Sequence, residues 1–150
     1  MKKITALLLS AFLLLGGALA EQEVILPDGA HSLMLPEGMS ALPRDPGMKE
    51  LYAVFGEEGL EMEIFVYPGN GADLTENAQT LVSGGKEAEV REIRGVELLV
   101  YRDTDEADGA KCIGYMYPAG DSFVEICFWY GTNEAGLKIR SMMETFQELE

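Results

Sequence analysis

The sequence predicts an α+β domain in which an antiparallel sheet of about six to eight strands is covered by two helices, one mid-chain and one C-terminal. Two observations predict it. Short apolar segments follow one another through tight turns, which is typical of antiparallel strands. Apolar residues recur with helical spacing after Asp73 and again after Thr132. Because a one-sided helix must bury its apolar face, both helices are expected to pack on the sheet.

The first twenty residues are unlike the rest of the chain. Lys2 and Lys3 precede an apolar run over 6–15, and the segment ends in Gly16-Gly-Ala-Leu-Ala20. This pattern predicts a secretory signal peptide cleaved after Ala20. The run is shorter than the roughly 20 residues that span a membrane, and no cysteine follows it for lipid attachment. We therefore expect residues 21–150 to form a single globular domain, secreted or otherwise extracytoplasmic, without membrane insertion after cleavage.

The charge of the chain excludes one class of partner. The formal net charge is −15, and removing Lys2 and Lys3 with the signal peptide lowers it to −17. Binding of nucleic acid requires clustered Lys and Arg, so a nucleic-acid partner is not expected. The acids are scattered among apolar runs, which is typical of a solvated surface. The expected partner is an unknown protein or small ligand, and no motif for a cofactor is present.

The strands are predicted from local patterns. Residues 24–26 and 32–35 flank Pro27-Asp-Gly-Ala-His31 and predict a hairpin. Four further segments alternate or run apolar between turn residues: 51–55, 60–67, 88–93 and 96–102.

The helices are predicted from their ends and their apolar faces. Asp73 can accept the free N–H groups of the first turn, with Glu76 three residues later, and Gly84-Gly85 ends the segment. The last helix starts near Thr132 or Asn133. The expected apolar faces are Leu74, Ala78, Leu81 and Val82 for the first helix, and Ala135, Ile139, Met142, Met143, Phe146 and Leu149 for the second.

Two cysteines lie in the last predicted hairpin. If Pro118-Ala-Gly-Asp121 is the turn, Tyr117 faces Ser122, and Cys112 lies directly opposite Cys127. Outside the cytoplasm such a pair is expected to form a disulfide. Two alternatives stay open: two reduced buried cysteines, or a reactive redox pair, for which no C-x-x-C motif is present.

Alternation along this hairpin separates two faces. One face is strongly apolar, carries Ile113 and Tyr115, and should meet a helix. The other carries a glutamate and is expected to be less buried. The aromatic residues of this hairpin are expected mainly to form core. If a ligand surface exists, its candidates are Phe123, Glu125 and Trp129 beside Gly114.

No catalytic residue can be assigned. His31 is the only histidine, and we interpret it as a surface turn residue because no nucleophile motif accompanies it. Two of the 26 acids could form the carboxylate pair of a hydrolase, but nothing singles out a pair.

The acidic loop offers a second candidate site. Hard oxygen ligands are supplied there by Asp103, Asp105, Glu106 and Asp108. The EF-hand pattern fails, since Gly114 stands where the bidentate glutamate is required. A weak calcium site is therefore an alternative to an ordinary solvated loop.

The order of elements resembles the PsbP-like fold. The resemblance covers most of residues 24–149 and includes an opening hairpin that ends in Leu33-Met-Leu-Pro-Glu-Gly-Met39. It implies a central antiparallel sheet with helices on its faces, in a class whose members are mostly non-enzymatic binding or assembly factors, and it implies no functional residues. We expect a secreted non-enzymatic binding or accessory domain. The alternatives are a small extracytoplasmic hydrolase that uses a carboxylate pair, and a weak calcium-dependent binding module.

Overall fold

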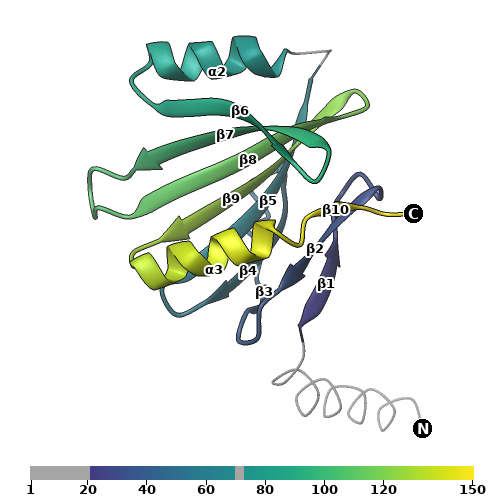
Figure 1. Cartoon of the computed structure of the whole chain (residues 1–150). Coiled ribbons are helices and arrows are strands. Elements are labelled where there is room, and N and C mark those ends of the chain that lie inside the picture. Colours follow the sequence, from purple (N-terminus) through teal and green to yellow (C-terminus); the bar gives the residue numbers. More distant parts are fainter. Residues whose placement is uncertain (1–20, 70–72) are drawn as a thin grey trace, which may run out of the picture.

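The computed structural model describes residues 21–69 and 73–150, so the predicted signal peptide lies outside the described residues. Within them, a seven-stranded antiparallel sheet has the order β3-β4-β5-β9-β8-β7-β6, and a three-stranded sheet has the order β1-β2-β10 (Figure 1). The elements are β1 Gln22–Ile25, β2 His31–Leu35, β3 Ser40–Leu42, β4 Leu51–Glu57, β5 Leu60–Pro68, α2 Leu74–Ser83, β6 Glu87–Ile93, β7 Val96–Thr104, β8 Lys111–Ala119, β9 Ser122–Tyr130, α3 Asn133–Met143 and β10 Gln147–Glu148.

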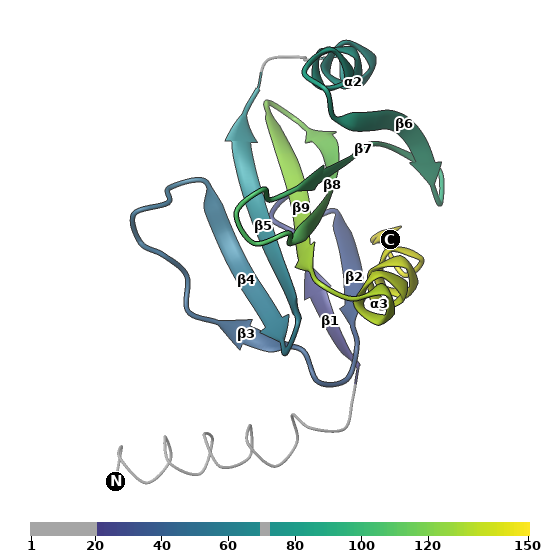
Figure 2. The ribbon, with the colours of Figure 1, turned by 90° about the vertical axis from the view of Figure 1, so that its left-hand side faces the viewer.

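The two helices lie on opposite faces of the large sheet, which confirms the predicted fold class. Helix α3 and the β1–β2 hairpin lie on the same side of the sheet (Figure 2). Helix α2 lies against Ala88 and Val90 of β6. The side chain of Arg91 lies on the α3 side, as the alternation of side chains along a strand requires.

The main core lies between the α3 face of the sheet, α3 itself and the β1–β2 hairpin. Its fully buried members come from both sheets and from the segment between α3 and β10: Leu33, Leu35, Met62, Ile64, Leu98, Ile126, Phe128 and Phe146. A smaller cluster lies on the opposite face and comprises Leu51, Val54, Phe65, Cys112 and Cys127. The cysteines therefore face away from α3.

The predicted register of the last hairpin was wrong by two residues. The turn contains two residues rather than four, because Ala119 pairs with Ser122. Gly120 takes a positive φ of 61° at the first turn position, which suits the tight turn that matches the twist of paired strands. Cys112 consequently pairs with Trp129, while Cys127 pairs with Gly114. A shift of two residues leaves the division into faces unchanged.

The ends of the predicted helices are largely confirmed. Asp73 caps α2 by accepting from the backbone of Thr75 at 2.7 Å, and Thr132 caps α3. Two details differ. Val82 is 53% exposed, so the apolar face of α2 is shorter than predicted. Helix α3 ends at Met143, and the chain after it extends into β10, which pairs with β2.

His31 is packed rather than free in a surface turn. Its ring stacks on Phe146 at a centroid distance of 5.3 Å and meets the edge of Tyr117 at 5.0 Å. Its Nδ1 lies 2.6 Å from Asp28 Oδ2. Asp28 Oδ1 also accepts from the backbone of Ala30. The histidine thus connects the β1–β2 turn to Phe146 in the segment between α3 and β10.

Asp28 predicts a pH dependence of stability. Burial alone would raise the pKa of this carboxyl group, but the hydrogen bonds from His31 and Ala30 lower it below its ordinary value of 3.8. A lowered pKa in the folded state contributes stability above the unfolded pKa, and that stability is lost as the pH falls through the folded value. We expect Asp28→Asn to lower the free energy of unfolding at pH 7, measured by urea unfolding. The free energy of unfolding of this variant should also decrease less than that of wild type as the pH falls below 4. Asp121→Asn, which removes the same charge from the β8–β9 turn, should do neither.

Candidate functional site

The two cysteines lie side by side on the face opposite α3. Their Sγ atoms are 3.2 Å apart, and both side chains are buried. The structure holds them as free thiols, so the predicted disulfide is not formed in it. Residues at diagonal positions on paired strands are within reach of each other, which explains why the pair meets although the predicted register was wrong.

The cysteine face is closed, contrary to the expectation of a less buried ligand surface. Glu125 is 6% exposed and Phe123 is 7% exposed. Tyr101 donates its hydroxyl to Glu125, and its ring lies over Gly114, where a Cβ atom would overlap it. Burial raises the pKa of Tyr101, and the neighbouring charge of Glu125 raises it further. Glu125 is therefore a hydrogen-bonded acceptor inside this face.

Trp129, the third candidate of the ligand surface, is also engaged by a carboxylate. Its Nε1 donates to Glu63 Oε2 at 3.1 Å. Burial raises the pKa of Glu63, the hydrogen bond from Trp129 opposes this, and the charges of Glu61 and Glu125 add to the rise. Neither Glu63 nor Glu125 lines the hollows described below. The arrangement is that of a structural network rather than of an acid pair facing a substrate.

The four acids of the loop do not form a cation site. Asp103 pairs with Lys86 at 2.7 Å. Asp105 and Asp108 accept from backbone N–H groups of the loop itself, each at 2.8 Å. In the part of the chain that the structure describes, no three His, Cys, Asp or Glu residues are placed to hold a metal ion. Three of the four acids therefore have partners within the loop or in Lys86, which accounts for their positions without a bound cation.

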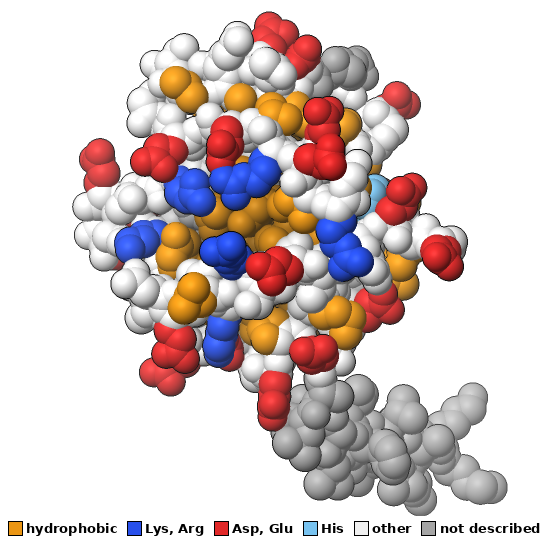
Figure 3. Space-filling model, viewed as in Figure 1, with side chains coloured by type: hydrophobic (Ala, Val, Ile, Leu, Met, Phe, Trp, Pro, Cys, Tyr) orange, Lys and Arg blue, Asp and Glu red, His pale blue; other side chains and the backbone are white. Residues whose placement is uncertain are grey.

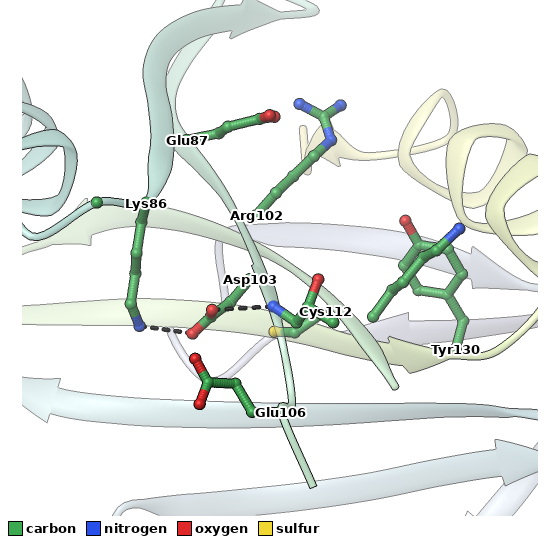
Figure 4. A pocket seen from close by; sticks show the side chains of 10 residues that line it. Lys86, Glu87, Arg102, Asp103, Glu106, Cys112 and Tyr130 are labelled. Carbon is green, nitrogen blue, oxygen red and sulfur yellow. Dashed lines mark hydrogen bonds and ion pairs between the residues drawn. The ribbon is translucent and has the colours of Figure 1, made fainter. Parts of the chain in front are cut away.

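A hollow of about 440 Å³ lies beside this loop. Figure 4 shows Lys86 reaching Asp103, with Cys112 next to them and Glu106 alongside. We call this hollow the cysteine pocket, and its lining residues are Gly85, Lys86, Glu87, Arg102, Asp103, Thr104, Glu106, Lys111, Cys112 and Tyr130. It places Cys112, whose side chain is 3% exposed, at the edge of the hollow.

A second hollow lies on the α3 face, between α3 and the strands β6 and β7. Figure 3 shows Lys and Arg side chains gathered there around an apolar floor, with Asp and Glu side chains mostly farther out. Its volume is about 370 Å³. We call it the arginine hollow, and its lining residues are Arg91, Arg102, Ile113, Tyr115, Tyr130, Gly136, Ile139 and Arg140.

The floor of the arginine hollow is buried and its rim is cationic. Tyr115 is 5% exposed and meets the ring of Phe128 edge to face. Burial raises the pKa of Tyr115, while the positive charges of Arg102 and Arg91 act in the opposite direction. Arg91, Arg102 and Tyr115 line the same hollow.

The three arginines differ in how they are paired. Arg91 pairs with Glu89, and Arg140 pairs with Glu144 at 3.6 Å. Both pairs are exposed, and exposed pairs contribute little stability. Among residues 21–69 and 73–150, Arg102 forms no ion pair or hydrogen bond through its side chain, although it lies opposite Glu87. Its donors remain available to a ligand.

The sequence reasoning missed this hollow. Arg91, Arg102 and Arg140 come from three separate elements, β6, β7 and α3, so no local motif contains them. A signal was present in the alternation of the strands. Arg91 and Arg102 occupy positions on the same face as Leu98 and Ile113, which is the face predicted to meet a helix.

Comparisons with known proteins establish the fold. No family model matches the chain, and no curated protein matches it in sequence. Among solved structures, the chain is similar to a protein of Bacteroides thetaiotaomicron with a TM-score of 0.61 at 11% identity, over 88% of this chain and 50% of that one. It is similar to PsbP (CyanoP) of the cyanobacterium Synechocystis, with a TM-score of 0.61 at 11% identity over 87% of this chain and 93% of that one. It is also similar to LpqN of Mycobacterium tuberculosis, with a TM-score of 0.54 at 10% identity over 87% of this chain and 91% of that one.

These similarities confirm the PsbP-like resemblance at the level of fold. The chain spans half the length of the Bacteroides protein. At identities of 10–11% the similarities carry the fold alone, because one fold can host unrelated functions. None of the helices in the described residues is long and apolar enough to cross a membrane.

The ring of Tyr101 occupies the space that a Cβ atom on Gly114 would need. A methyl group added at Gly114 should therefore reduce stability. Gly114→Ala should push the Tyr101 ring off β8 and away from Glu125, because an added Cβ has no free space there. We expect a loss of about 1–3 kcal/mol in the free energy of unfolding, the range typical of overpacking. Gly131→Ala is the matched control, since its Cβ would meet nothing within 4 Å. Equal stability of the two variants in urea would contradict the packing described above.

Proposed function

We propose that this chain is a non-enzymatic extracytoplasmic binding domain that holds a small organic anion in the arginine hollow. The observation that carries the proposal is the convergence of Arg91, Arg102 and Arg140 on one apolar hollow. The chain has a formal net charge of −15. Most of the charged side chains of this chain are acidic, so a hollow lined by three arginines differs in charge from the chain as a whole.

The chemistry of the hollow defines the class of ligand. Guanidinium groups present fixed pairs of N–H donors that suit carboxylate and phosphate oxygens. The floor of Ile113, Tyr115 and Ile139 is buried and apolar, with Tyr130 at its side. A site with a charged rim and an apolar floor favours a ligand that carries one anionic group on a flat apolar body. No nucleophile or general base lies among the lining residues in a catalytic arrangement, which supports binding rather than catalysis.

Two observations support an extracytoplasmic location. Residues 1–20 have the pattern of a signal peptide. LpqN, which shares the fold, is described as involved in cell envelope biogenesis. The location is tested by N-terminal sequencing of the protein recovered from outside the cytoplasm of its source cells, which should begin at Glu21. Recovery only from the cytoplasm, with residues 1–20 intact, would contradict export.

The binding proposal is tested with phenyl phosphate and inorganic phosphate as probes, by calorimetric titration of residues 21–150. We expect phenyl phosphate to bind more tightly than inorganic phosphate, because its ring reaches the apolar floor. Arg102→Gln should weaken phenyl phosphate binding by about tenfold or more, since a hydrogen bond to a charged group contributes about 1.5–3 kcal/mol.

The matched control is Lys49→Gln, which removes one positive charge from an exposed loop residue. It lies outside the arginine hollow and should leave the affinity unchanged. Equal weakening by both substitutions would mean that the net charge, and not the hollow, attracts the anion. No measurable binding of phenyl phosphate would contradict the ligand class proposed above.

A further inference from the structure

We propose that Cys112 and Cys127 are a redox-active dithiol that reacts with a small disulfide entering the cysteine pocket. The cysteine pocket shares Arg102 and Tyr130 with the arginine hollow, but this inference requires no anion bound there. It rests on the position of the two thiols relative to each other and to the pocket.

The first observation is the contact between the thiols. The Sγ atoms are 3.2 Å apart on neighbouring strands, so bond formation requires only a small approach within a rigid sheet. Each side chain is held in the small cluster of the cysteine face. The pair is therefore preorganised to close on itself.

The second observation is that only one of the two cysteines borders a hollow, although both side chains are buried. Cys112 lines the cysteine pocket, whereas Cys127 does not. Cys127 instead lies opposite Glu63 of β5, and the negative charges of Glu125 and Glu63 disfavour its thiolate. Cys112 is thus the sulfur that an incoming reagent can meet first.

The electrostatics of the pair point the same way. The hydrogen bond with Cys127 lowers the pKa of the Cys112 thiol, against the effects of burial and of Glu125. The pKa of the Cys127 thiol is raised, first by that same hydrogen bond and then by burial. The thiolate is the nucleophile in thiol–disulfide exchange, and Cys112 takes the attacking role because it is the cysteine that lines the pocket.

The reaction balances as two exchanges. The Cys112 thiolate attacks one sulfur of the small disulfide; a new S–S bond forms, the old S–S bond breaks, and the first thiol leaves with the proton that Cys112 released. Cys127 then loses its proton and attacks Cys112 Sγ. The Cys112–Cys127 bond forms, the mixed disulfide breaks, and the second thiol leaves with that proton. The protein dithiol is oxidised, and the small disulfide is reduced to two thiols.

The test uses folded residues 21–150 with glutathione disulfide, followed by intact-mass measurement. Wild type should lose the mass of two hydrogen atoms without a lasting adduct. Cys127→Ser should keep one glutathione on Cys112, because the second exchange is blocked. Cys112→Ser should gain no adduct while folded. An adduct on Cys127 in that variant, or reaction of wild type only in denaturant, would overturn the proposal.

A second measurement leaves both cysteines in place and therefore covers the case in which a serine variant fails to fold. Wild type is treated with limiting iodoacetamide, and peptides are mapped. Cys112 should be alkylated first, and Glu106→Trp, which narrows the cysteine pocket, should slow that alkylation at least several-fold. Ala107→Trp is the matched control, since Ala107 is exposed but does not line the pocket. Labelling of Cys127 first, or equal rates in both tryptophan variants, would show that the pocket is not the route to the thiols.

Discussion

The pairing of β8 with β9 is the constraint on which the rest of the structure depends. These strands lie inside the seven-stranded sheet, and β5 and β7 are built on their outer edges. A slip of one residue would exchange the two faces and expose the main core. The two-residue turn at Gly120 prevents this, because it fixes which residues of the two strands pair. This register decides on which face of the sheet each side chain of β8 and β9 lies.

The two faces that result have different chemistry. The α3 face buries aliphatic and aromatic side chains beneath a helix, and at its margin the cover stops short of β6 and β7, which leaves the arginine hollow. The opposite face has its helix only over β6 and β7. It closes elsewhere by large side chains, with Tyr101 lying over Gly114 to reach Glu125. A glutamate and two thiols are consequently buried together without a helix above them.

The elements of this protein follow from local patterns, but contacts between distant residues do not. Asp73 and Thr132 cap their helices as predicted, because capping depends on neighbours within three residues. The turn of the last hairpin was predicted two residues too long, since Pro118 resembles a strand end but pairs with Phe123 inside the strand. Glu125 was expected on an open surface, because charge alone does not reveal the tyrosine that crosses from β7 to bond it.

The sequence by itself determined the fold class, both helices and all strands except β3 and β10. It also determined the division of the predicted strands into two faces, because alternation and capping act over a few residues. It also placed both cysteines on one face. Only the tertiary structure decided that the thiols meet diagonally, that Cys112 borders a pocket, and that Arg91, Arg102 and Arg140 surround one hollow. Those facts depend on how the sheet curves and where α3 ends, and packing between distant segments sets both.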